Sequence, residues 1–211
     1  MESLPIYCIN LSSAPDRWAR VTRRLAAYGL TATRWDASTP ASCRTPYVSY
    51  LTLNQRACAE SHFRLWEHVV ASGHSHVLIL EDDAVFRKDW IPITNAKLKE
   101  PGWDALFLNV SEETSLEQWA PCHNQCMTAA YILTARAAAW LVATFRPCLY
   151  AADGMTQALQ QAAPCLTYFP WLVIQEGRES YIQTKDHFDA DIAKVHRLLA
   201  AADFPLSSYD F

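Results

Sequence analysis

A run of four apolar residues followed directly by three acids is the feature that most limits how this chain can fold. The segment from Val77 to Leu80 is short and apolar, which predicts a strand buried on both faces of a parallel sheet. Glu81, Asp82 and Asp83 follow without a break. Because ligands of open α/β sheets bind beyond the carboxyl ends of the strands, we expect these acids at the mouth of a crevice.

The acidic triplet also predicts a metal. Three adjacent carboxylates repel one another and resist burial, and a hard divalent cation with oxygen ligands relieves both costs. Glu81, Asp82 and Asp83 are therefore candidate ligands of Mn²⁺ or Mg²⁺. The alternative is a solvated turn after a core strand, and the triplet alone does not decide between the two.

Size, charge and cysteine content exclude several classes of protein. A chain of 211 residues with 51% hydrophobic content can form one substantial core, so we expect a single domain. The net charge of -4 argues against a nucleic-acid binder. The start, MESLPIYCINL, predicts neither a signal peptide nor a transmembrane segment, so we expect a cytoplasmic protein. Seven scattered cysteines, an odd number, favour reduced thiols over a disulfide framework.

Hydrophobic periodicity predicts alternating strands and helices, and hence an α/β fold. The predicted strands are residues 6–11, 31–35, 77–80, 103–110, 127–133 and parts of 165–175. The predicted helices are 12–28, 52–72, 89–100, 134–145, a short helix near Asp153, and 189–202. Thr52 and Gln55 form a capping box at the start of the second helix, and Gly73 ends it. His62 falls at the edge of the apolar face of this helix, where a core histidine and a catalytic one are both possible.

Several blocks of the sequence together resemble glycosyltransferase family 25, over roughly positions 5 to 180. The blocks are IYCINLSSAPDRW, LTLNQRACAESHFRLW, VLILEDDAVF, AAYILTARAAAWLV, the Asp of AADGM and the LVIQ of PWLVIQ. The family includes bacterial lipooligosaccharide galactosyltransferases and collagen hydroxylysine galactosyltransferases. The resemblance implies a GT-A-like, Rossmann-type mixed sheet flanked by helices. It also implies transfer, with inversion, of a hexose such as galactose from a UDP-sugar to a hydroxyl of a glycan or of a hydroxylated side chain.

The same resemblance assigns expected roles to individual residues. It implies that Glu81, Asp82 and Asp83 bind the metal, with Asp83 as the most direct ligand. Residues 1–110 would form the half that binds the nucleotide-sugar, and residues 111–211 the acceptor side. The residues expected near the substrates are Asn10, Leu11, Arg17, Ser61, His62 and Gln175. The chain lacks a glycine before Ala130 and a proline-containing pair at 151–152, which leaves acceptor recognition less defined than donor binding.

The chemistry of transfer requires a base that removes the proton of the acceptor hydroxyl. Asp153 is the first candidate, followed by Asp104 and Glu112; the alternative for Asp153 is a helix N-cap. Because no glycine-rich phosphate loop is present, Arg17 and a metal would hold the diphosphate. Two other functions remain open: a catalytically silent binding module with the same fold, and a metal-dependent hydrolase.

Overall fold

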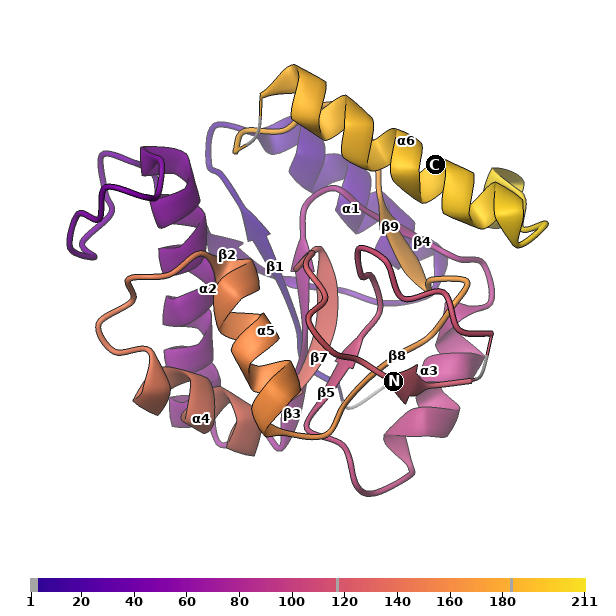
Figure 1. The fold of residues 1–211 in the computed structure, drawn as a ribbon, viewed down its shortest axis with the longest axis horizontal. Helices are drawn as coiled ribbons and strands as arrows, with labels where there is room; N and C mark the ends of the chain where they lie inside the picture. Colours follow the sequence, from indigo (N-terminus) through magenta and orange to yellow (C-terminus); the bar gives the residue numbers. More distant parts are fainter. Residues whose placement is uncertain (1–3, 117, 183) are drawn as a thin grey trace.

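The described residues, 4–116, 118–182 and 184–211 of a computed structural model, are organised around a seven-stranded sheet (Figure 1). The sheet has the order β2-β1-β3-β7-β5-β8-β6, and β4 and β9 form a separate pair. The strands are β1 (Ile6–Asn10), β2 (Thr33–Asp36), β3 (His76–Glu81), β4 (Ala84–Phe86), β5 (Ala105–Phe107), β6 (Ala120–Pro121), β7 (Ala130–Thr134), β8 (Cys165–Thr167) and β9 (Val173–Gln175). The helices are α1 (Pro15–Ala27), α2 (Leu53–Ser72), α3 (Trp90–Leu98), α4 (Ala135–Thr144), α5 (Ala152–Ala162) and α6 (Lys185–Ala201), with a 3₁₀ turn at Leu206–Ser208.

Helices cover both faces of this sheet. Figure 1 shows α2, α4 and α5 grouped together on one side, and apolar side chains from all three enter one core cluster. A second cluster on the opposite face contains side chains from α1 and α3. The predicted α/β fold, a Rossmann-type mixed sheet flanked by helices, is confirmed.

β3 is the buried strand that the sequence predicted, but its neighbours differ from the expectation. Val77 and Ile79 pack into one cluster, while Leu78 and Leu80 pack into the other. β3 runs parallel to β1 but antiparallel to β7, so it is a parallel strand on one side only, within the mixed sheet that the family resemblance implied. A buried apolar run records burial on both faces and not the direction of the neighbouring strands, which is why the sequence could not show this.

Local capping signals fixed three helix boundaries, the two ends of α2 and the start of α4. The Thr52 hydroxyl accepts a hydrogen bond from the Gln55 N–H, the Gln55 side chain accepts one from the Thr52 N–H, and α2 ends at Gly73 with φ of 75°. Thr134 caps α4 by accepting a hydrogen bond from the N–H of Ala137. α6 begins at Lys185, earlier than predicted, and the short strand β6 lies in a segment for which no strand was predicted.

The β4–β9 pair places a distant segment beside the acids. Ala84, directly after the acidic triplet, pairs with Gln175 in antiparallel register. The N–H of Glu176 also donates to the carbonyl of Asp83 at 2.8 Å. Gln175 therefore reaches the acidic cluster through backbone pairing.

Two further properties concern membrane insertion and cysteines. Within the described ranges, none of the helices combines the length and apolar character needed to cross a membrane. All seven cysteines are free thiols in the structure, and Cys8, Cys122, Cys148 and Cys165 are buried.

Candidate active site

A cavity of about 730 Å³ opens beyond the carboxyl ends of β1 and β3. Its walls come from strand ends and from α1, α2, α5 and α6. The lining includes the expected metal ligands, the residues expected near the substrates and the first base candidate: Asn10, Leu11, Arg17, Ser61, His62, Glu81, Asp82, Asp83, Asp153 and Gln175. The structure thus brings these ten residues together, while their individual roles stay predictions.

Asp82 is occupied by protein partners. Its Oδ1 accepts hydrogen bonds from Arg17 Nε at 2.6 Å and pairs with Nη2 at 2.5 Å, and its Oδ2 accepts one from Asn10 Nδ2 at 2.6 Å. Both oxygens are committed, so Asp82 is poorly placed to bind a metal. Its assignment as a metal ligand stays a prediction, because a metal would have to share these oxygens with Arg17 and Asn10. Part of the charge repulsion is instead relieved by the guanidinium of Arg17.

Asp83 has an oxygen without a partner. Its Oδ2 lies 3.3 Å from Nη2 of Arg17 and 3.3 Å from Nε2 of Gln175, but the buried Oδ1 has no hydrogen-bond partner among the described residues. Burial raises the pKa of Asp83 to about 7. A buried carboxylate oxygen that has no hydrogen-bond donor lowers the stability of the ligand-free protein. A bound ligand or ion that supplies the missing partner would explain why this oxygen is there.

Glu81 ends a chain of buried hydrogen bonds. Trp66 Nε1 can only donate, so the Tyr131 hydroxyl accepts from it at 2.9 Å and donates its own hydrogen to His62 Nδ1 at 2.9 Å. The proton of neutral His62 is thereby placed on Nε2, which donates to Glu81 Oε1 at 3.3 Å. The Thr128 hydroxyl donates to the same oxygen at 2.8 Å.

This chain determines the state of the Glu81 carboxylate. Burial acts to raise the pKa of Glu81, but hydrogen bonds from His62 and Thr128 bring it below its usual value. Both bonds use Oε1, which leaves Oε2 for a ligand in the cavity. His62 is therefore a fully buried histidine with a hydrogen-bond partner on each ring nitrogen, as the core alternative expects, and a catalytic role for it stays a prediction.

Asn10, Leu11 and Ser61 hold the walls of the cavity. The side chain of Asn10 donates a hydrogen bond to Asp82 and accepts one from Arg34, which lies 2.8 Å from Asn10 Oδ1. Arg34 also donates to the Leu11 carbonyl at 3.1 Å. The Ser61 hydroxyl accepts from the N–H of Ser38 at 2.8 Å. These contacts position the segments that follow β1 and β2.

Asp153 is not the helix cap of the alternative interpretation. The N-cap of α5 is Ala151, and Asp153 lies in the first turn, where its Oδ1 accepts a hydrogen bond from the N–H of Met127 at 3.0 Å. Burial, together with the charge of Glu81, raises the pKa of Asp153 to about 6. A carboxylate with a raised pKa beside a cavity is suited to accept a proton near neutral pH.

The other two base candidates are placed less favourably. Asp104 lies outside the cavity lining and forms a bidentate pair with Arg136, at 2.8 and 3.0 Å. Glu112 lines the cavity but is bound by Lys194 Nζ at 2.5 Å. Geometry therefore favours Asp153 among the three.

Sequence reasoning missed three residues near the acids. Tyr131 lies on β7 and Thr128 lies just before this strand, and the pairing of β7 with β3 brings them to His62 and Glu81. Cys58, which the sequence analysis treated only as one of seven reduced thiols, lines the cavity. Its position four residues before His62 on one helix was the signal that could have identified it.

Oδ1 of Asp83 and Oε2 of Glu81 are carboxylate oxygens of cavity-lining residues for which the described part of the chain provides no hydrogen-bond donor. Oxygen atoms of this kind fit Mn²⁺ or Mg²⁺, which also keep water or substrate oxygens as ligands. The orphaned Oδ1 of Asp83 is the observation in favour of a cation. Asp83 and Glu81 thus offer oxygen ligands of the kind expected for the metal, and metal binding by the acidic triplet stays a prediction.

An α/β sheet with an acid-lined cavity beyond its strand ends defines a ligand-binding protein of the Rossmann-like class. The chain belongs to glycosyltransferase family 25: the profile described as "Glycosyltransferase family 25 (LPS biosynthesis protein)" matches residues 3–121, more than half of its length. The family predicted from the sequence blocks is confirmed.

The chain is similar to proteins named "Inactive glycosyltransferase 25 family member 3". The human protein is 28% identical over 151 residues, covering 65% of this chain and 23% of its own. The mouse protein is 25% identical over 139 residues, covering 53% and 24%. This chain therefore spans about a quarter of the length of these relatives.

A solved structure from Bacillus anthracis, assigned as a glucose-1-phosphate thymidylyltransferase in complex with a sucrose, covers 89% of this chain and 75% of that chain. The TM-score is 0.44 and the identity 10%, a likeness that carries no inference about this protein.

Proposed function

We propose that this protein transfers a hexose, with galactose as the favoured sugar, from a UDP-sugar to a hydroxyl of a glycan acceptor such as lipopolysaccharide or lipooligosaccharide, with inversion and with Mn²⁺ or Mg²⁺ as cofactor. The observation that carries the proposal is the buried, unpartnered Oδ1 of Asp83 beside a cavity large enough for a nucleotide-sugar. Membership of the family supplies the reaction class.

Residues around the acidic cluster would stabilise the leaving group of the donor sugar. A bound divalent cation would neutralise the negative charge that develops on the departing diphosphate. Asp83 and Glu81 would hold that cation, while Arg17 and Asn10 keep the neighbouring Asp82 in place. The expected use of Arg17 as a phosphate clamp stays a prediction; in the structure its guanidinium contacts Asp82, Asp83 and the Glu179 carbonyl.

Asp153 would act on the acceptor. Its raised pKa and its place in the cavity lining suit a base that takes the proton of the attacking hydroxyl. The hydrogen bond from the Met127 N–H occupies Oδ1 and fixes the side chain, so Oδ2 is the oxygen proposed to receive the proton.

The proposal is tested by calorimetry of UDP with and without Mn²⁺, followed by donor hydrolysis with a panel of UDP-hexoses. We expect Mn²⁺ to strengthen UDP binding, Asp83→Asn to abolish that increase, and Asp104→Asn, a change outside the cavity, to leave it intact. Equal UDP affinity with and without the metal would contradict the proposed cofactor.

A catalytically silent binding module is the second candidate, because the relatives of this chain are named inactive. The two candidates differ in turnover: a silent module binds UDP but neither hydrolyses a donor nor transfers its sugar. A two-metal hydrolase is less well supported, because Arg17 and Asn10 occupy Asp82, which leaves two acids of the triplet to hold two metal ions.

A further inference from the structure

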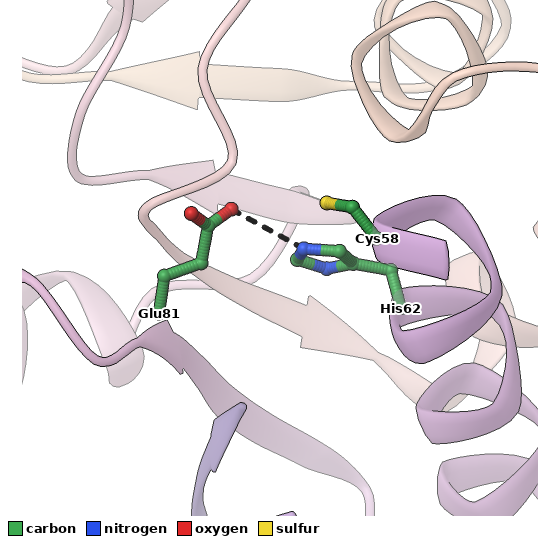
Figure 2. A group of neighbouring side chains, drawn as sticks. All are labelled: Cys58, His62 and Glu81. Atoms are coloured by element: carbon green, nitrogen blue, oxygen red, sulfur yellow. Dashed lines mark hydrogen bonds and ion pairs between the residues drawn. The ribbon is translucent and has the colours of Figure 1, made fainter. Parts of the chain in front are cut away.

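Three side chains of different chemistry converge next to the acidic cluster. The ligand atoms of Cys58, His62 and Glu81, one from each residue, all lie within 4.8 Å of one another. Figure 2 shows Cys58 and His62 projecting from the same side of α2 toward Glu81 at the end of β3. A thiol, an imidazole and a carboxylate are the three ligand types that proteins use for zinc.

The backbone that carries these residues is fixed at both ends. Cys58 and His62 are four residues apart on a helix, so their side chains lie one above the other on one face. The capping box at Thr52 and the left-handed Gly73 define where α2 begins and ends. Glu81 is the last residue of β3, a central strand of the sheet.

We propose that Cys58, His62 and Glu81 form a site for a thiophilic divalent cation, for which Zn²⁺ is the best match. Bond lengths of about 2.0 to 2.3 Å around tetrahedral zinc place its ligand atoms roughly 3.3 to 3.6 Å apart. His62 Nε2 and Glu81 Oε1 are already 3.3 Å apart. Closing the site therefore needs the sulfur to move by only about 1 Å, a rotamer adjustment.

The set of donor atoms distinguishes this site from the proposed donor-sugar site. Mg²⁺ and Mn²⁺ prefer oxygen, whereas sulfur and nitrogen donors favour zinc. All three residues line the cavity, so a fourth coordination position faces the open space, where water or a substrate oxygen can bind. The two sites share Glu81, which makes simultaneous full occupancy unfavourable.

Binding changes the protonation of two of the ligands. Burial raises the pKa of the Cys58 thiol, so the thiol must release its proton to the solvent when the ion binds. The proton on His62 Nε2 moves to Nδ1, which then donates to the Tyr131 oxygen. The Tyr131 hydroxyl hydrogen loses its acceptor on His62, a cost that the metal bonds must offset.

The proposal is tested with Co²⁺, a spectroscopic substitute for Zn²⁺, added to the full chain after chelation and without nucleotide. We expect a near-ultraviolet thiolate-to-cobalt absorption band that Zn²⁺ removes by displacement and that excess Mg²⁺ leaves unchanged. Cys58→Ser should abolish the band. It should also weaken cobalt binding by more than the roughly 10- to 100-fold that is typical when a residue beside a metal ligand, and not the ligand itself, is replaced. Cys126→Ser is the matched control, because Cys126 also lines the cavity but lies outside this group.

A second measurement does not depend on the folding of a variant. Zn²⁺ should protect Cys58 of the unmodified protein from alkylation, as read by peptide mass spectrometry, and should leave Cys126 reactive. Asp83→Asn should retain the cobalt band even if it loses metal-linked UDP binding, which separates this proposal from the proposed function. Absence of a thiolate band, its persistence in Cys58→Ser, or unprotected Cys58 would overturn the proposal.

Discussion

The same change, Asp→Asn, should affect protein stability very differently at the two adjacent aspartates of the acidic cluster. Asp82 accepts three charge-assisted or short polar contacts from Arg17 and Asn10, whereas Asp83 has one buried oxygen without a partner. Asp82 is therefore expected to support the fold, and Asp83 to serve a ligand.

The magnitude for Asp82→Asn follows from the state in which Arg17 is left. Burial raises the pKa of Asp82, and the nearby charge of Arg17 offsets this effect only in part. The intact Asp82–Arg17 ion pair therefore contributes little net stability. Removing the carboxylate nevertheless leaves a guanidinium whose side chain is only 8% exposed, and losing one partner of a buried pair costs about 3 to 5 kcal/mol. Arg17 keeps a contact with Asp83 at 3.3 Å and with the Glu179 carbonyl at 3.2 Å, which favours the lower end, about 3 kcal/mol.

Urea unfolding measures this cost. With an m-value of about 2 to 3 kcal/mol per molar, a loss of about 3 kcal/mol lowers the midpoint by about 1 to 1.5 M. Asp83→Asn should change the free energy of unfolding by no more than about 1 kcal/mol, because it also removes a buried charge that lacks a full set of partners. Equal destabilisation by the two variants, or a midpoint for Asp82→Asn within error of the wild type, would refute the assignment of the two roles.

Four further predictions follow from single sites. Asp153→Asn should keep UDP affinity within a few-fold while transfer falls by about 10² or more in steady-state kinetics; unchanged transfer would exclude Asp153 as the base. Tyr131→Phe should cost about 1 to 3 kcal/mol in urea unfolding, because Trp66 Nε1 loses its acceptor; a neutral effect would contradict the buried chain of bonds. Gly73→Ala should cost about 1 to 2 kcal/mol, because a φ of 75° is strained for alanine although its Cβ meets no atom within 4 Å. Burial acts to raise the pKa of Glu176, but three neighbouring arginines bring that pKa below its usual 4.5. The ionised carboxylate therefore stabilises the fold above pH 4.5. This stabilisation is lost as the pH falls through the lower pKa of the folded state. The stability difference between wild type and Glu176→Gln should accordingly be largest near pH 7 and shrink below about pH 4.5, and a difference that does not depend on pH would contradict the ion pairing.

The sequence by itself determined the features that depend on local chemistry. The capping box at Thr52 and the glycine at position 73 fixed the ends of α2, because caps satisfy backbone groups within one turn. The apolar run before Glu81 identified a strand buried on both faces. The ordered blocks of residues identified the family.

Tertiary structure decided what each polar side chain of the cavity contacts. Asp82 and Asp83 are neighbours in sequence, but Arg17 occupies only one of them fully. Asp153 faces Met127, and Cys58 and His62 meet Glu81, because segments far apart in sequence pack together. Local patterns record the conformation and burial of a segment, whereas the partner of a buried charge depends on how the strands are ordered in the sheet and on which helix covers each face.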